Sequence, residues 1–336
     1  MRFCVVGAGS IGGFVATLMA EAGHDVSVVA RGPHLAAIQD RGLRLDFNDR
    51  RITASVAASE FAGDFGPQDV VVVSVKAPSL PDTLPTVKPL LGPETSILVA
   101  MNGVPWWMFD GFGPHEGLRL RSVDGSGALE RFGCRDRLLG CVLHIACDVP
   151  EPGLIRHNNQ NRMIVGEPNG TITARAERLV DAMKAAGIGA EITSRVQQEV
   201  WIKLLGNLPF APISMITGAT NDVLAKDPAL RKVMKAMFEE ASEVGQYFGL
   251  EPGMTSEERI DLGGALSGFK ASTRQDYEKG RPVELDVIVN AVLEMGDIAG
   301  IGTPTIDMVY ALAAQKASVA GLYTYDGAPE LEWNTA

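Results

Sequence analysis

The stretch Gly7-Ala8-Gly9-Ser10-Ile11-Gly12 decides the fold of this chain, because it joins a strand pattern to a helix pattern. Residues 2–6 predict a short strand, and residues 12–22 predict a helix. Gly7 allows a tight turn, Gly9 lets backbone approach a pyrophosphate, and Gly12 permits close packing of helix on strand. The helix N-terminus then offers free N–H groups to the phosphates. Residues 7–12 therefore predict a dinucleotide-binding turn, and the alternative is a glycine-rich turn without a ligand.

Further short apolar runs follow this turn and indicate a sheet. Residues 25–30, 70–75 and 96–101 have the length and composition of strands and are separated by helical segments. Continuous apolar strands that alternate with helices are typical of a parallel sheet covered on both faces. We therefore expect an α/β fold of the Rossmann type, with a doubly wound parallel sheet. Strand patterns resume at residues 138–147 and 162–165.

The segment at residues 105–135 breaks this rhythm. It contains Pro105, a Gly113-Pro114 turn, two tryptophans and several glycines, and we expect an irregular excursion with one short hairpin.

The second part of the chain carries helical patterns only. Residues 195–208, 228–248, 282–299 and 305–319 have apolar side chains at three- and four-residue spacing, as amphipathic helices do. We therefore expect an all-α C-terminal domain. The boundary is predicted near residues 189–194, where a Gly-Ile-Gly sequence closes the first region. This gives a cofactor domain at residues 1–192 and a helical substrate domain at residues 193–336.

The net charge and the cysteine spacing disfavour several classes of partner and site. The formal net charge of -11 disfavours a general nucleic-acid or anionic-membrane binder, because the mean field of the protein repels phosphate. The four cysteines lack C-x-x-C spacing, which favours free thiols and no metal site. We expect neither a signal peptide nor a membrane span, and hence a cytoplasmic protein. A homodimer is expected on general frequency alone.

The ends of the predicted strands indicate which dinucleotide is bound. An NAD enzyme usually places Asp or Glu at the end of the second strand, but here that strand ends in Ala30-Arg31. A guanidinium pairs well with a 2′-phosphate, so Arg31 favours NADPH/NADP+. Lys76 and Asn102 follow the next two strand runs, at the edge where such sheets bind ligands. The alternatives are a solvated Arg31, a surface lysine and an ordinary Asn102-Gly103 turn.

Two polar patches mark the helical half. Lys203 and Asn207 lie one turn apart on a predicted helix, although Lys203 alone could be a solvated lysine that pairs with Glu199. The second patch runs from Ser272 to Asp286 and, taken alone, is a polar loop entering a helix. Glu284 and Asp286 would then be acids of the first helical turn, stabilised by the helix dipole.

Taken together and in order, these motifs resemble the ketopantoate reductase (2-dehydropantoate 2-reductase) family over nearly the whole chain. The matching pieces are G-x-G-x-x-G at 7–12, Arg31, V-K-A at 75–77, N-G at 102–103, W-x-K-x-x-x-N at 201–207, Asn221, and S-x-x-Q-D with G-R-x-x-E-x-D at 272–286.

The resemblance implies a role for each matching residue. Lys203 corresponds to the family's general acid, which protonates the carbonyl oxygen of a 2-keto acid while NADPH delivers hydride to the carbon. Glu284 would hydrogen-bond a substrate hydroxyl, and Ser272, Asn207, Asn221 and Asn102 would hold the remaining polar groups. Arg31 and Lys76 match the cations beside the 2′-phosphate. A positioned ammonium would also stabilise the alkoxide charge that develops on oxygen.

Two departures from the family pattern leave the substrate open, and a third is minor. Where the family commonly has a second asparagine one turn after Asn207, this chain has Ala211. The tryptophan-bearing segment at 105–130 is longer than the family needs, and its tryptophans either line a bulkier pocket or pack as plain core. Residues 157–161 are asparagine-rich and are interpreted as a polar turn. The leading prediction is reduction of ketopantoate to pantoate. The alternatives are a bulkier 2-keto acid or related carbonyl, and a non-catalytic NADPH sensor.

Overall fold

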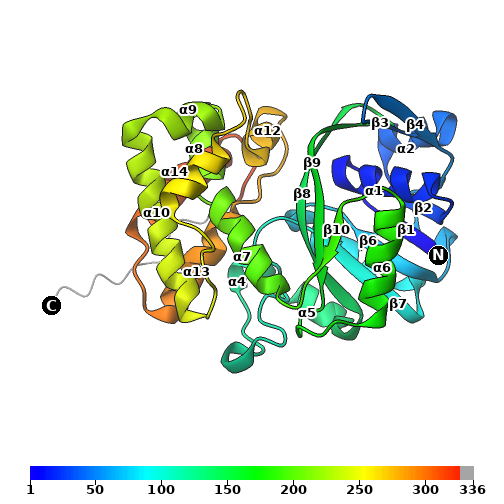
Figure 1. Ribbon diagram of the computed structural model, residues 1–336, viewed down its shortest axis with the longest axis horizontal. Helices are drawn as coiled ribbons and strands as arrows, with labels where there is room; N and C mark the ends of the chain where they lie inside the picture. Colours follow the sequence, from blue (N-terminus) through cyan, green and yellow to red (C-terminus); the bar gives the residue numbers. More distant parts are fainter. Residues whose placement is uncertain (326–336) are drawn as a thin grey trace. The chain divides into compact units, whose positions relative to one another are not determined.

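The computed structural model describes residues 1–325, which divide into two compact units (Figure 1). The first unit consists of Met1–Arg119 and Asp124–Val200, and the second of Leu120–Val123 and the chain from Trp201 onward. This division falls inside helix α7 (Val196–Asn207). The predicted boundary of two independently folding domains after residue 192 stays a prediction.

A ten-stranded sheet forms the centre of the first unit, in the order β4-β3-β9-β8-β7-β6-β1-β2-β5, with β10 beside β9. Most neighbouring strands are parallel, which confirms the predicted fold class, but β3–β4 and β8–β9 pair antiparallel. The strands are β1 (Arg2–Val6), β2 (Asp25–Val29), β3 (Leu43–Phe47), β4 (Arg50–Ala54), β5 (Ala57–Ser59), β6 (Gln68–Val73), β7 (Leu91–Ala100), β8 (Leu138–Glu151), β9 (Leu154–Gly166) and β10 (Ala190–Ile192).

Helices cover the faces of this sheet because its strands are apolar on both sides. Alternate residues of β1 and β6, such as Phe3 and Val70, share one buried cluster with Leu18 of α1 (Ser10–Glu21) and Leu179 of α6 (Ala174–Ala185). The opposite face receives the helical turns at Leu84–Leu90. The remaining helices of this unit are α2 (Gly32–Arg41), α3 (Leu80–Thr83) and α5 (Ala128–Phe132), and α4 (Arg121–Asp124) lies at the division between the units.

The structure corrects two sequence predictions in this unit. The hairpin expected within residues 105–135 is wrong, because the segment forms turns and short helices instead. Trp106 to Asp110 are all buried in consecutive turns, whereas a hairpin would alternate buried and exposed residues. The polar turn expected at 157–161 is also wrong. These residues lie within β9, where Gln160 has a φ of 55° and the β8–β9 register shifts.

The second unit is helical, as predicted. It contains the last residues of α7, then α8 (Phe210–Thr217), α9 (Asn221–Lys226), α10 (Pro228–Tyr247), α11 (Ser256–Gly263), α12 (Ser272–Glu278), a π-helical segment (Asp286–Asn290), α13 (Ala291–Ala299) and α14 (Pro304–Val319). The helix predicted from residue 282 begins only at Leu285. The Val283 N–H donates to the Leu322 carbonyl, so the chain before Leu285 pairs with another segment.

One helical stretch, Val196–Thr217, is long and apolar enough to cross a membrane, which corrects our expectation that no stretch reaches that length. It comprises α7 and α8, and 67% of its apolar window is buried inside the structure. A buried core helix of a globular fold has the same length and composition, so this stretch is weak evidence for a span.

Candidate cofactor and catalytic sites

The glycine-rich turn has the geometry that a dinucleotide requires. Gly7 adopts a φ of 93°, and a Cβ atom there would lie 2.7 Å from Val75 Cγ1. A Cβ atom at Gly12 would overlap the Gly7 carbonyl, so the helix approaches the turn more closely than any side chain permits. At Gly9, by contrast, no described atom lies within 4 Å of where a Cβ would be, and α1 begins there without a side-chain cap. The N-terminus of α1 therefore has no side-chain cap, as expected of a helix end that binds a pyrophosphate.

His34 supports this turn, although the sequence motifs gave no signal for it. Its Nδ1 accepts a hydrogen bond from the Gly153 N–H at 3.1 Å, so the proton of the neutral ring is on Nε2. Nε2 lies 2.7 Å from the Ala8 carbonyl oxygen and donates to it. His34 lies in the first turn of α2, three residues after Arg31. One side chain thus ties the glycine-rich turn to the helix that Arg31 precedes.

The predicted cofactor cations and Asn102 come together at one edge of the sheet. Strands β7, β6, β1 and β2 are consecutive and parallel, so their carboxyl ends meet at one edge. Gly7 follows β1, Arg31 lies two residues after β2, Lys76 three residues after β6, and Asn102 two residues after β7. Arg31 is exposed, and its side chain makes no hydrogen bond or ion pair to any residue that the structure describes. This edge is where doubly wound sheets bind ligands.

The predicted catalytic residues lie on separate elements of the second unit. Lys203 and Asn207 are half-buried and one turn apart on α7. Asn221 opens α9 and is buried, with its Nδ2 3.4 Å from the Gly263 carbonyl oxygen. Its Oδ1 is also buried, and no residue of the described chain donates to it. Ser272 is exposed at the start of α12.

Glu284 is only 6% exposed and precedes the helix rather than lying in its first turn. The expected first-turn role is therefore wrong for Glu284 and right for Asp286. Burial raises the pKa of the Asp286 carboxyl, which accepts hydrogen bonds from the Tyr323 hydroxyl and from Asn290 Nδ2. Together with the Val283–Leu322 bond, these contacts anchor the chain on both sides of Glu284. A π-helical turn at this place is frequent near functional residues.

Comparison with known proteins identifies the family. Two family models, described as Ketopantoate reductase PanE/ApbA and Ketopantoate reductase PanE/ApbA C terminal, match residues 3–170 and 195–317. A 2-dehydropantoate 2-reductase of Mesorhizobium japonicum is 42% identical over 327 residues, which cover 96% of this chain and all of that protein. The chain belongs to the ketopantoate reductase family.

Solved structures agree with this assignment. A Ralstonia solanacearum protein that carries the ketopantoate reductase name is 39% identical, with a TM-score of 0.91 over 96% of this chain and 99% of that one. D-mandelate dehydrogenase in complex with NADH and anilino(oxo)acetate has the same fold, with a TM-score of 0.80 over 96% of this chain and all of that one, at 18% identity. The family's curated members are oxidoreductases by name.

The tryptophan-bearing segment, residues 105–130, belongs to the first unit except for Leu120–Val123. Trp107 is 1% exposed and fills the space over Gly140, where a Cβ atom would lie 2.5 Å from its ring. Of the two roles left open by the sequence, plain packing therefore holds for Trp107. Ala211 lies buried on α8.

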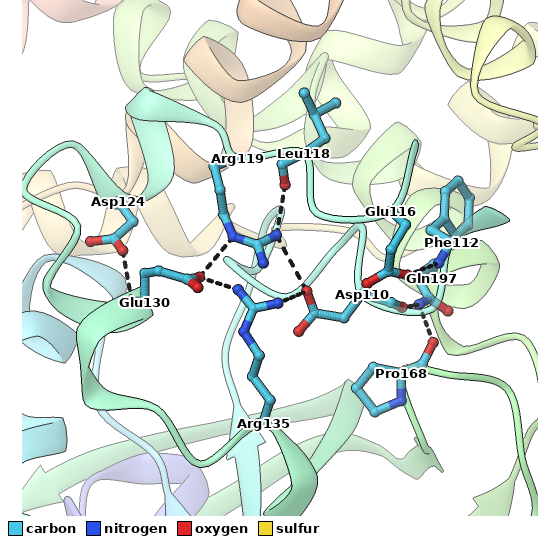
Figure 2. Close-up of polar contacts among 10 residues, drawn as sticks. All are labelled: Asp110, Phe112, Glu116, Leu118, Arg119, Asp124, Glu130, Arg135, Pro168 and Gln197. Atoms are coloured by element: carbon cyan, nitrogen blue, oxygen red, sulfur yellow. Dashed lines mark hydrogen bonds and ion pairs between the residues drawn. The ribbon is translucent and has the colours of Figure 1, made fainter. Parts of the chain in front are cut away.

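Asp110, three residues after Trp107, belongs to a closed ring of four charged side chains (Figure 2). Asp110 Oδ1 pairs with Arg119 at 3.3 Å and with Arg135 at 2.6 Å, and both guanidiniums also pair with Glu130. The side chain of Asp110 is 11% exposed, and its Oδ2 is buried without a hydrogen bond among the described residues. Burial, opposed by Arg119 and aided by the negative charges of Glu116 and Glu130, raises the pKa of Asp110 to about 6.

Proposed function

We propose that this member of the ketopantoate reductase family reduces 2-dehydropantoate (ketopantoate) to pantoate with NADPH, as a step of pantothenate biosynthesis. The observation that carries the proposal is the end-to-end 42% identity with the 2-dehydropantoate 2-reductase of Mesorhizobium japonicum. The glycine-rich turn and the polar residues of the second unit are consistent with that reaction.

NADPH rather than NADH is supported by the end of β2. Arg31 is exposed, has no acidic partner among the described residues, and follows the strand whose end contacts the adenosine ribose in doubly wound folds. Its guanidinium can pair with a 2′-phosphate, and Lys76 adds a second cation at the same sheet edge. Residues 7–12 would hold the pyrophosphate.

The chemistry assigned to the chain is proton donation and substrate positioning. A bound nicotinamide dinucleotide supplies the hydride that the carbonyl carbon receives. Lys203 donates a proton from its ammonium group to the carbonyl oxygen, so that C=O becomes CH–OH. Glu284 accepts a hydrogen bond from a substrate hydroxyl, while Asn102, Asn207, Asn221 and Ser272 hold the remaining polar groups. A buried acceptor such as Asn221 Oδ1 gains most from such a donor, because an unsatisfied buried polar atom costs free energy.

The test is the oxidation of NADPH and of NADH, followed by absorbance, with ketopantoate, pyruvate and bulkier 2-keto acids. We expect selective turnover of ketopantoate with NADPH. Lys203→Ala is expected to lower kcat by at least about a hundredfold with little change in NADPH binding. Lys232→Ala, which removes an exposed lysine of α10 in the same unit, is the control and should keep full activity.

A bulkier 2-keto acid is the second candidate substrate, and Ala211 favours it because the family's asparagine is missing there. Turnover of a bulkier acid in place of ketopantoate would support this candidate and overturn the first. Tight NADPH binding without turnover of any acid would overturn both and favour a cofactor sensor.

A further inference from the structure

An arginine from a neighbouring helix contacts the backbone of α7 at Lys203. Arg259 lies on α11, and its Nη2 donates to the Ile202 carbonyl at 2.7 Å and lies 3.4 Å from the Lys203 carbonyl oxygen. Within the described residues it pairs with no carboxylate, and burial lowers the pKa of its guanidinium. A buried charge without an acidic partner destabilises the folded state. The contact of Arg259 with the helix carbonyls therefore indicates a role other than stability.

Gly206 leaves the room that this contact needs. A Cβ atom at Gly206 would lie 2.5 Å from both Cζ and Nε of Arg259, so any side chain there would displace the guanidinium. Glycine inside a helix is unfavourable relative to alanine, and the close approach accounts for its presence here. Residues 203, 206 and 207 share one helix face, since they are three and four positions apart. The guanidinium therefore covers the face that carries Lys203 and Asn207.

Both sides of α7 are fixed. Opposite this face, Trp201 is fully buried against Gly245 of α10, where a Cβ atom would lie 2.5 Å from the indole Cε2. Helix α11 is itself held at its start by a capping box between Thr255 and Glu258. The positive guanidinium also lies near the C-terminal end of α7, where the helix dipole favours a cation.

We propose that Arg259, with Gly206 as the space it occupies, is a positioning residue that sets the place of Lys203 for proton transfer. This inference rests on the proposed function, because it takes Lys203 as the proton donor. Without the guanidinium, the end of α7 can shift relative to the bound substrate, and small misplacements of a catalytic group lower the rate of the chemical step. The effect therefore falls on kcat more than on KM.

The first test compares Arg259→Met, which keeps the apolar stem, with Arg259→Lys, which keeps a donor. We expect Arg259→Met to lower kcat about tenfold or more, with KM within about twofold and NADPH binding unchanged. Arg259→Lys is expected to recover part of that loss. Wild-type kcat in folded Arg259→Met, or equal losses in the two variants, would overturn the proposal.

A double-mutant cycle gives the second test and does not depend on a single variant. Gly206→Ala is expected to lower kcat and the melting temperature in the presence of Arg259, and to lower neither in the Arg259→Ala background. Additive losses would overturn the proposal, because they would show that Gly206 and Arg259 act separately. Lys203→Ala distinguishes this failure from that of the proposed function. If Lys203→Ala stays active, the proton donor is misassigned, whereas the Gly206–Arg259 coupling of the melting temperature is unaffected.

Discussion

The charged ring around Asp110 predicts a pH-dependent stability that one substitution isolates. Asp110 accepts from two arginines through the same oxygen, while its other oxygen is buried without a partner among the described residues. Removing the carboxylate from water costs more than its attraction to Arg119 offsets, and Glu116 and Glu130 repel its negative charge. The pKa of Asp110 therefore rises to about 6 from its ordinary 3.8. Asp110→Asn keeps the shape of the side chain and removes its titration.

The raised pKa of Asp110 determines whether stability rises or falls with pH. The folded state binds the Asp110 proton more tightly than the unfolded state, so the stabilising contribution is complete below about pH 4 and is lost as pH rises through about 6. A difference of about 2.2 pKa units corresponds to about 3 kcal/mol. Because the unfolded carboxyl is already partly ionised at pH 4, we expect the stability of the wild type relative to Asp110→Asn to fall by about 2 kcal/mol between pH 4 and pH 7.

Urea denaturation of both proteins, at half-unit steps of pH over this range, measures that difference. Glu60→Gln is the control, because it removes an exposed negative charge of the same unit that has no contact with the ring. A difference between wild type and Asp110→Asn that stays constant with pH, or that grows in favour of the wild type, would refute the reasoning. The arginines would then outweigh burial in setting the pKa of Asp110.

Three further outcomes are expected from single substitutions. Arg31→Ala should weaken NADPH binding and leave NADH binding nearly unchanged in fluorescence titrations, and equal losses would show that Arg31 does not contact the 2′-phosphate. His34→Ala removes the bonds to Ala8 and Gly153 and should weaken NADPH binding about tenfold in the same titration with kcat retained, so an unchanged Kd would contradict its supporting role. Tyr323→Phe leaves the buried Asp286 carboxyl short of a donor and should lower the free energy of unfolding by about 1–3 kcal/mol in urea, and an unchanged value would exclude that bond as a source of stability.

The fold and the cofactor turn were predictable because their signals are local. Gly7 and Gly12 are needed by a turn of six residues, and the composition of each strand shows that it is buried on both faces. Arg31, Lys76 and Asn102 were found because each follows a strand, and a parallel sheet brings strand ends to one edge. None of these inferences needs a contact between residues far apart in sequence.

The positioning residues were not predictable, because their roles depend on such distant contacts. Arg259 lies in the polar sequence Glu257-Glu258-Arg259, which is typical of a solvated helix face, yet its guanidinium contacts carbonyls more than fifty positions away. His34 has no motif of its own and acts through Ala8 and Gly153. A single sequence does not show these contacts, because each residue taken alone is equally well explained without its partner.

The distinction between local signals and distant contacts also applies to the residues that select the substrate. Two features of the sequence bear on the choice of substrate, the tryptophan-bearing segment and Ala211. Trp107 packs over Gly140 of β8, so a substitution at Trp107 changes mainly the packing of the first unit. Ala211 lies on α8, which packs against α12, the helix that begins at Ser272. If ketopantoate fails as a substrate, Ala211→Asn is therefore the first change to make, because it restores the family's donor without disturbing the packing around Trp107.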